Sequence, residues 1–190
     1  MVHEAPLRRT EHGLKAAAEG WFVLNAREAR WYDRKGQGYA PSLEREGHFS
    51  QLGIGLYVLG PGEPMAMYHW ETDQEDFLLL SGDALLIVEG EERPLRQWDF
   101  VHCPAGTQHV IVGAGDVPCI VFGVGAREHH TVRLPDGTLE GTDDWGAYTV
   151  DNVALRHAAG VEEETADAQQ AYARFPAAEP VHYRDGWLPG

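Results

Sequence analysis

Apolar side chains alternate with small or polar ones along the middle of this chain, which is the pattern of half-buried β-strands. Residues 52–58 carry apolar side chains at every second position, and the stretch ends at a Gly60-Pro61-Gly62 turn. Further short stretches follow at 65–71, 77–81, 84–89, 92–95, 100–103, 109–112 and 119–124. Many short strands at close spacing predict an all-β fold with one antiparallel barrel of the jelly-roll type.

The two ends of the chain lack this alternation, so we expect them to lie outside the barrel and to pack on it. Residues 1–47 combine a short helix at 13–19, a short strand at 21–25 and an extended arm from 31 to 47. Residues 127–190 contain an acidic loop at 135–144 and one helix at about 161–175, whose apolar positions form a stripe. The predicted organisation is an N-terminal arm (1–47), a barrel (48–126) and a C-terminal extension (127–190).

Composition narrows the possible partners and the compartment. The 190 residues include 30 acidic and 15 basic side chains, and the net charge of -15 repels nucleic acid and anionic membrane surfaces. No apolar stretch approaches the roughly 20 residues that cross a bilayer, and the first twenty residues lack the apolar core of a signal peptide. We therefore expect a cytoplasmic protein, in which Cys103 and Cys119 are buried small hydrophobes rather than a disulfide.

Two histidines and two glutamates form a candidate metal site. His69 and Glu71 lie two residues apart in an extended segment and so share a face, which Met65 and Met67 also share. Glu75 and His109 follow in later strands. Two imidazoles with one or two carboxylates suit a divalent transition metal such as Fe, Mn, Zn or Ni. The alternative is a polar pocket without metal, in which the glutamates accept hydrogen bonds from the histidines.

The segment around the first of these residues resembles the first sequence motif of the cupin superfamily. That motif runs Gly, a His-x-His pair, Glu and Gly, and here Gly62, His69, Glu71, Glu75 and Gly82 occupy those places. Glu75 and Gly82 have the expected separation. Glu71 replaces the second histidine of the pair, so the implied ligand set contains a carboxylate at that position.

The segment around His109 resembles the second cupin motif, which runs Gly, Pro-x-Gly, His and Asn. Pro104, Gly106 and His109 fit it at the expected spacing, whereas Trp98 stands in place of the Gly and Gly113 in place of the Asn. The resemblance covers about residues 50–125. It implies a double-stranded β-helix, a cupin jelly-roll barrel, with a small-molecule site in its interior.

Within that barrel the resemblance implies one divalent metal bound by His69, Glu75 and His109, where an unpaired carboxylate would be costly to bury. Glu71 is expected to be either a fourth metal ligand or a proton carrier, and Glu71 and Glu75 are the catalytic candidates. The leading interpretation is a metal-dependent enzyme acting on a small polar molecule, isomerase- or epimerase-like, or dioxygenase-like with Fe(II).

The alternative function is a non-catalytic binding or sensing protein that uses the same pocket, because the fold alone does not select a reaction. We also expect a homodimer. Both extensions carry large apolar residues that one small barrel does not cover, and closed two-fold dimers are the commonest oligomers.

Overall fold

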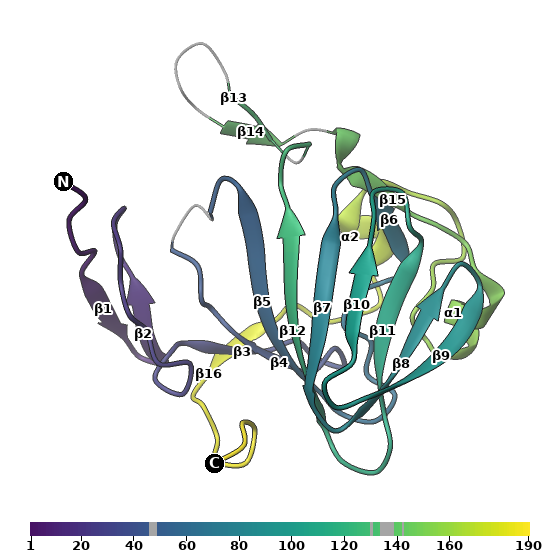
Figure 1. Cartoon of the computed structure of the whole chain (residues 1–190), viewed down its shortest axis with the longest axis horizontal. Coiled ribbons are helices and arrows are strands. Elements are labelled where there is room, and N and C mark those ends of the chain that lie inside the picture. Colours follow the sequence, from purple (N-terminus) through teal and green to yellow (C-terminus); the bar gives the residue numbers. More distant parts are fainter. Residues whose placement is uncertain (46–48, 130, 134–138, 142) are drawn as a thin grey trace.

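Two antiparallel sheets face each other and form the walls of one barrel (Figure 1). The computed structural model describes residues 1–45, 49–129, 131–133, 139–141 and 143–190. The larger sheet has seven strands, in the order β10 (Phe100–Cys103), β7 (Glu75–Ser81), β12 (Cys119–Ala126), β5 (Leu52–Leu59), β4 (Tyr39–Pro41), β3 (Trp31–Asp33) and β16 (Glu179–Val181). The smaller sheet has five, in the order β15 (Gly146–Tyr148), β6 (His69–Glu71), β11 (His109–Ala114), β8 (Asp83–Val88) and β9 (Glu91–Arg96). The predicted all-β fold with one antiparallel barrel is confirmed.

Two hairpins and short helices complete the described chain. The first hairpin, β1 (Leu7–Thr10) and β2 (Gly13–Ala16), lies beside the barrel near the N-terminus (Figure 1). A small hairpin, β13 (Thr131–Arg133) with β14 (Leu139–Gly141), is followed by a 3-10 helix, η1 (Asp143–Trp145). The α-helices are α1 (Asn152–Arg156) and α2 (Ala168–Ala171). No helix among these described segments is long and apolar enough to span a membrane.

The barrel core is built by the period-two alternation that the sequence shows. Phe77 and Leu79, two residues apart on β7, are both buried, and they pack with Ile111 of β11 and Val121 of β12 in one apolar cluster between the sheets. Burying side chains of this size stabilises a fold by about 1.5–3 kcal/mol each. Cys103 and Cys119 are free thiols buried in the same cluster, as expected.

Both extensions add strands to the barrel sheets and cover one of their faces. Trp31 of β3 is completely buried against Leu56 and Val58 of β5. Trp187 of the C-terminal tail closes this layer, with its ring centroid 5.0 Å from that of Trp31 and 4.2 Å from that of Tyr39. Strands β3 and β4 of the arm and β15 and β16 of the extension therefore join a barrel whose central strands come from the predicted segment 48–126.

The predicted helix at 13–19 is wrong. Residues Gly13–Ala16 form β2, which pairs with β1 in register from Leu7 opposite Ala16 to Thr10 opposite Gly13. The cross-strand hydrogen bonds satisfy the backbone here, so the helix propensity of the alanine-rich segment does not decide its structure.

The predicted single helix at 161–175 is also wrong, because only Ala168–Ala171 are α-helical in that range. The Thr165 amide donates to the carbonyl of Tyr148 at 3.1 Å, and the Tyr148 amide donates to the Thr165 carbonyl at 2.9 Å. This bridge commits Thr165 to a pairing with Tyr148, so no helix runs through it, and α2 begins only where Asp167 caps it by accepting from the Gln169 amide. An unexpected helix, α1, begins after the similar cap Asp151. Residues 135–138 and 142 of the predicted acidic loop at 135–144 lie outside the described residues.

Candidate metal centre

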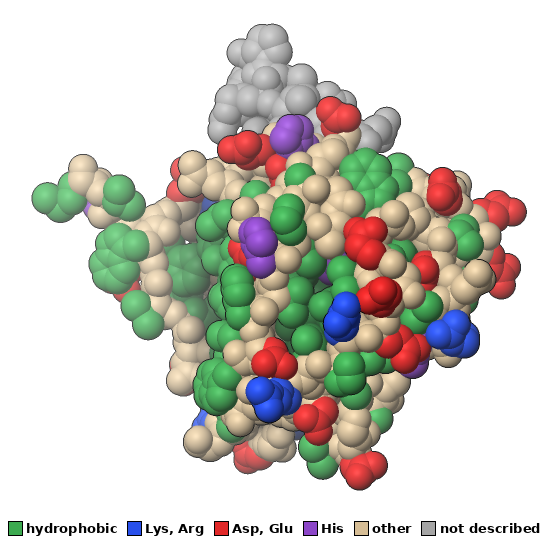
Figure 2. Space-filling model, turned by 45° about the vertical axis from the view of Figure 1, so that its right-hand side comes forward, with side chains coloured by type: hydrophobic (Ala, Val, Ile, Leu, Met, Phe, Trp, Pro, Cys, Tyr) green, Lys and Arg blue, Asp and Glu red, His purple; other side chains and the backbone are tan. Residues whose placement is uncertain are grey.

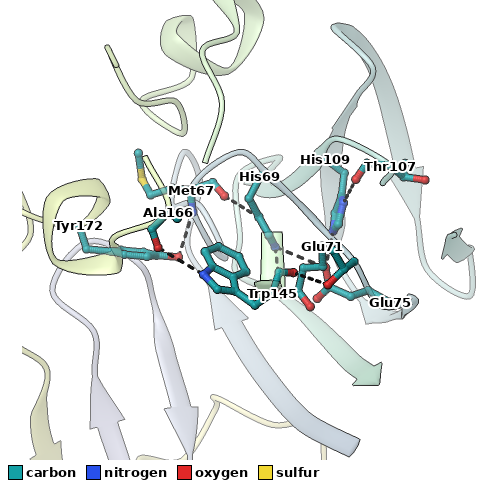
Figure 3. Close-up of polar contacts among 10 residues, drawn as sticks. Met67, His69, Glu71, Glu75, Thr107, His109, Trp145, Ala166 and Tyr172 are labelled. Atoms are coloured by element: carbon teal, nitrogen blue, oxygen red, sulfur yellow. Dashed lines mark hydrogen bonds and ion pairs between the residues drawn. The ribbon is translucent and has the colours of Figure 1, made fainter. Parts of the chain in front are cut away.

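Two strands of the smaller sheet and one of the larger bring the predicted metal ligands together. His69 on β6 and His109 on β11 are direct partners across an antiparallel pair, and their ring centroids lie 5.0 Å apart. Glu75 is the first residue of β7 in the opposite sheet. Figure 3 shows these side chains and Glu71 pointing toward one another from the two walls. The site thus depends on the closure of the barrel.

One carboxylate oxygen lies between the two imidazoles. Glu75 Oε2 is 3.4 Å from Nε2 of His69 and 3.3 Å from Nε2 of His109. The three ligand atoms lie within 4.8 Å of one another, a spacing that could hold one metal ion. The rings are almost completely covered, with 6% of His69 and 1% of His109 exposed.

The other ring nitrogen of each histidine fixes its orientation. Nδ1 of His69 lies 2.7 Å from the carbonyl oxygen of Met67, and Nδ1 of His109 lies 3.0 Å from that of Thr107 (Figure 3). A carbonyl oxygen only accepts, so each Nδ1 carries the hydrogen and donates it. In the neutral ring the lone pair is then on Nε2, aimed at Glu75. Backbone carbonyls hold metal-binding histidines in this way in many metalloproteins.

Two buried atoms of this cluster, Glu75 Oε2 and His109 Nε2, have no hydrogen-bond partner among the described residues. A buried polar atom without a partner costs about 1–3 kcal/mol, and more when it is charged. With Nε2 unprotonated, both atoms are acceptors and neither satisfies the other. A cation between them removes this cost, so the donor set fits a divalent transition metal.

Without a cation, the surrounding groups favour the protonated form of both histidines. Burial opposes the charged form of His69, but the carboxylates of Glu71 and Glu75 outweigh it and raise the pKa of His69 to about 10. Burial likewise opposes charge on His109, whereas contacts with Cys103 and Glu75 raise its pKa to about 9. Burial acts to raise the pKa of Glu75, yet the two histidines hold it well below its usual range. A metal ion must therefore compete with protons for this site.

Glu71 lies at the edge of the cluster. Its Oε1 is 3.6 Å from Nε2 of His69, and it is not among the three residues whose ligand atoms lie within 4.8 Å of one another. Its carboxylate also lines the adjoining cavity. The structure thus places Glu71 beside the candidate metal ligands, and its role as a fourth ligand stays a prediction.

A cavity of about 270 Å³ adjoins the cluster and is the natural place for a small molecule. Glycines on the inner faces of β5 and β12 leave this space open. A Cβ on Gly55 would lie 2.4 Å from the Tyr57 side chain, and one on Gly125 would lie 3.4 Å from Cγ of Glu75. The small residues that alternate with apolar ones in the sequence thus face the cavity, while Leu56 and Val58 face the covering layer.

The extensions supply several cavity residues that sequence reasoning missed. Arg34 comes from the N-terminal arm, and Trp145, Tyr148 and Tyr172 come from the C-terminal extension. Tyr148 pairs with His69 because β15 is the neighbour of β6, and this pairing leaves no local signal in the sequence. The one available signal was the set of aromatic residues in segments that have no barrel-strand pattern.

The expectation for the two methionines is half confirmed. Met65 lines the cavity, whereas Met67 is buried away from it, in a cluster with Tyr148, Val161 and Ala171. The predicted strand at 65–71 is extended only at His69–Glu71, so the alternation assumed for the methionines does not apply before His69.

Fold and site together define a class of protein, namely a single β-barrel with a candidate His, His, Glu metal centre that opens on an internal cavity. The sequence model of one family, described as Cupin domain, matches residues 55–125, which include all four candidate site residues. Residues 55–125 of this chain therefore form a cupin domain.

Solved structures are similar to parts of this chain. A protein from Acidithiobacillus ferrooxidans, provisionally named a sugar phosphate isomerase, is 26% identical with a TM-score of 0.40, over 43% of this chain and 59% of that one, less than two thirds of its length. A sugar phosphate isomerase of the cupin superfamily from Silicibacter pomeroyi is 23% identical with a TM-score of 0.42, over 62% and 80%. The polyketide cyclase RemF from Streptomyces resistomycificus is 13% identical with a TM-score of 0.47, over 56% and 79%. No curated protein matches the sequence.

Proposed function

We propose that this cupin is a metal-dependent enzyme acting on a small polar molecule, with one divalent transition metal bound by His69, Glu75 and His109. The observation that carries the proposal is the buried cluster of these three side chains, whose ligand atoms lie within 4.8 Å of one another, with Glu75 Oε2 3.3 Å from His109 Nε2. In the metal-free protein, protonated histidines would satisfy Glu75, and a metal ion would replace those protons.

A bound divalent metal polarises a carbonyl or hydroxyl oxygen of a small molecule and stabilises the negative charge that develops on it. Glu71 is our candidate for moving a proton, and its position in the cavity wall next to His69 and outside the three-residue cluster supports this role. Proton transfer at a carbon next to a polarised carbonyl is the chemistry of isomerases and epimerases. The three-residue cluster alone also suits Fe(II) and a dioxygenase-like reaction.

The aromatic residues of the C-terminal extension limit access of water to this chemistry. Tyr148 and Tyr172 line the cavity, and their rings meet edge to face with centroids 5.5 Å apart. Burial raises the pKa of both hydroxyls, so they stay protonated and neutral at physiological pH. They therefore serve as hydrogen-bond donors and as walls rather than as bases.

The aromatic wall of the cavity also supports the second candidate function, a binding or sensing protein without turnover. A ligand held against Trp145, Tyr148 and Tyr172 would connect the barrel interior with the C-terminal extension, and its binding could be read out there. The two candidates share the metal centre, and they differ in whether Glu71 performs chemistry.

Solvent isotope exchange separates the two candidates. The Mn²⁺- or Zn²⁺-loaded protein is incubated in D₂O with a panel of small hydroxyaldehydes, hydroxyketones and 2-oxo acids, and the products are followed by proton NMR. The enzyme proposal predicts deuterium incorporation next to the carbonyl, and its loss in Glu71→Gln. Binding of panel members with no chemical change would instead support the binding protein. An Fe(II)-loaded sample monitored for oxygen consumption covers the dioxygenase-like variant.

A further inference from the structure

Arg34 is a cation that the N-terminal arm places in the wall of the metal cavity. It lies just after β3, and its side chain lines the same cavity as His69, Glu71 and Glu75. The neighbouring Lys35 is engaged elsewhere, since its Nζ lies 3.2 Å from Asp33 Oδ2 and 2.8 Å from Glu179 Oε2. Two adjacent basic residues thus have different roles.

Neutral groups hold the Arg34 guanidinium in place. Nη2 donates to the carbonyl of Met65 at 3.0 Å, Nη1 donates to that of Gln37 at 3.4 Å, and the guanidinium carbon lies 5.2 Å from the centre of the Tyr57 ring. No carboxylate of the described residues forms an ion pair with Arg34. The guanidinium is always charged and has five N–H groups, so several donors remain for a further acceptor.

The charges of the other cavity residues offset one another. Arg127 Nη1 and Nη2 lie 2.9 and 3.1 Å from the two carboxylate oxygens of Glu44. Glu71 and Glu75 would together offset a divalent metal ion. The charge of Arg34 is then left over, so the cavity with metal bound has an excess of one positive charge.

This local excess contrasts with the rest of the molecule. The chain has a net charge of -15, and Figure 2 shows acidic side chains spread over the visible face with basic ones among them. Such a field repels anions at long range, so an anion that binds here must be recognised locally. Arg34 offers this recognition, because its planar fork matches the oxygens of a carboxylate or a phosphate.

We propose that Arg34 binds the anionic group of the substrate, so that this protein acts on a small carboxylate- or phosphate-bearing molecule whose other end reaches the metal. The contact between the other end of the substrate and the metal rests on the function proposed above, whereas anion binding by Arg34 does not. The hydroxyl of Tyr57 lies in the same wall, and burial raises its pKa, which keeps it protonated as a second donor.

Isothermal titration of the full-length protein tests this role, both with Mn²⁺ bound and after removal of metal by a chelator. The probes are malonate, inorganic phosphate and the uncharged malonamide. Arg34→Gln removes the charge, and Arg34→Met, which keeps packing on Tyr57, replaces it if Arg34→Gln fails to fold. The control is Arg96→Gln, which removes the same charge from a side chain that is 88% exposed.

The wild type and Arg96→Gln should bind malonate or phosphate in preference to malonamide. Arg34→Gln should bind that anion about tenfold or more weakly, as expected for the loss of a hydrogen bond between charged groups. Its Mn²⁺ affinity and its circular dichroism spectrum should match those of the wild type. Arg34→Lys identifies the anion, because lysine retains affinity for phosphate as a point charge but lacks the fork that fits a carboxylate.

Equal anion affinity of Arg34→Gln and the wild type would overturn the proposal, as would the absence of anion binding to the wild type in both metal states. Failure of the metal proposal has a different signature. The wild type would then bind no Mn²⁺, while the titrations of the metal-free protein would still report whether Arg34 binds the anion.

Discussion

Replacing His109 with alanine should abolish most of the stabilisation that a bound metal gives to this protein. His109 Nε2 is one of three ligand atoms within 4.8 Å of one another, and its ring is 99% covered by the barrel. The variant retains only His69 and Glu75 of this set. Changes to groups that merely orient metal ligands cost about 10–100-fold in affinity, so the loss of a ligand should cost at least the upper end of that range.

The effect on stability follows from mass action. At a metal concentration of about 100 times the wild-type dissociation constant, binding stabilises the folded state by about 2.7 kcal/mol. A roughly 100-fold weaker site leaves about 0.4 kcal/mol at the same concentration. At roughly 2–4 °C per kcal/mol for a chain of this size, the metal-induced rise in Tm should fall from about 5–11 °C to about 1–2 °C.

The measurement is a thermal melt by differential scanning calorimetry, with Mn²⁺ and with a chelator, for the wild type, His109→Ala and His102→Ala. Comparison with the chelated sample removes the direct effect of each substitution on packing. His102 is the matched control, because it is half exposed on β10 and its Nδ1 lies 2.6 Å from Asp76 Oδ1, outside the metal cluster. If Mn²⁺ raised the Tm of His109→Ala as much as that of the wild type, our assignment of the metal ligands would be refuted.

Four further predictions follow from the site and the surface. Metal affinity, measured by titration calorimetry, should rise by about tenfold or more per pH unit between pH 6 and 9, because metal must displace protons from His69 and His109; a flat profile would contradict this. The metal-free protein should lose stability over the same pH range. Protonated His69 and His109, whose pKa values are raised to about 10 and 9, stabilise the fold fully below about pH 6.5 and no longer above about pH 10; urea titrations would detect this loss. Glu71→Gln should retain a full equivalent of metal by elemental analysis if Glu71 is a proton carrier, whereas weaker binding would identify it as a fourth ligand. Light scattering should give twice the 21.1 kDa chain mass, and Trp21→Ser with Val23→Ser, which change side chains 52% and 79% exposed, should shift it toward the monomer; a monomeric wild type would exclude the homodimer.

Local signals in the sequence predicted only part of the candidate site. His69 and Glu71 share a face through the two-residue period of an extended segment, and the structure confirms that both side chains reach one cavity. The resemblance to cupin motifs added His109 and Glu75 from other strands. Their meeting was an inference from the family, since no local pattern shows that β6 and β11 are neighbours.

Local patterns failed where distant backbone groups compete for the same residues. The predicted helix at 161–175 is interrupted because Thr165 pairs with Tyr148, and the predicted helix at 13–19 is replaced by pairing with Leu7–Thr10. In both places the hydrogen bonds of the tertiary structure outweigh helix propensity, which amounts to less than about 1 kcal/mol per residue.

By itself, the sequence determined the barrel class, the central strands and the chemistry of the candidate metal ligands, because these depend on residue type and on periods of two. Only the tertiary structure decided which residues complete the cavity. Arg34 and Tyr172 lie more than a hundred residues apart in the chain, yet both line the wall beside Glu75. Such residues come together through strand pairing and packing between distant segments, and no short stretch of sequence encodes that proximity.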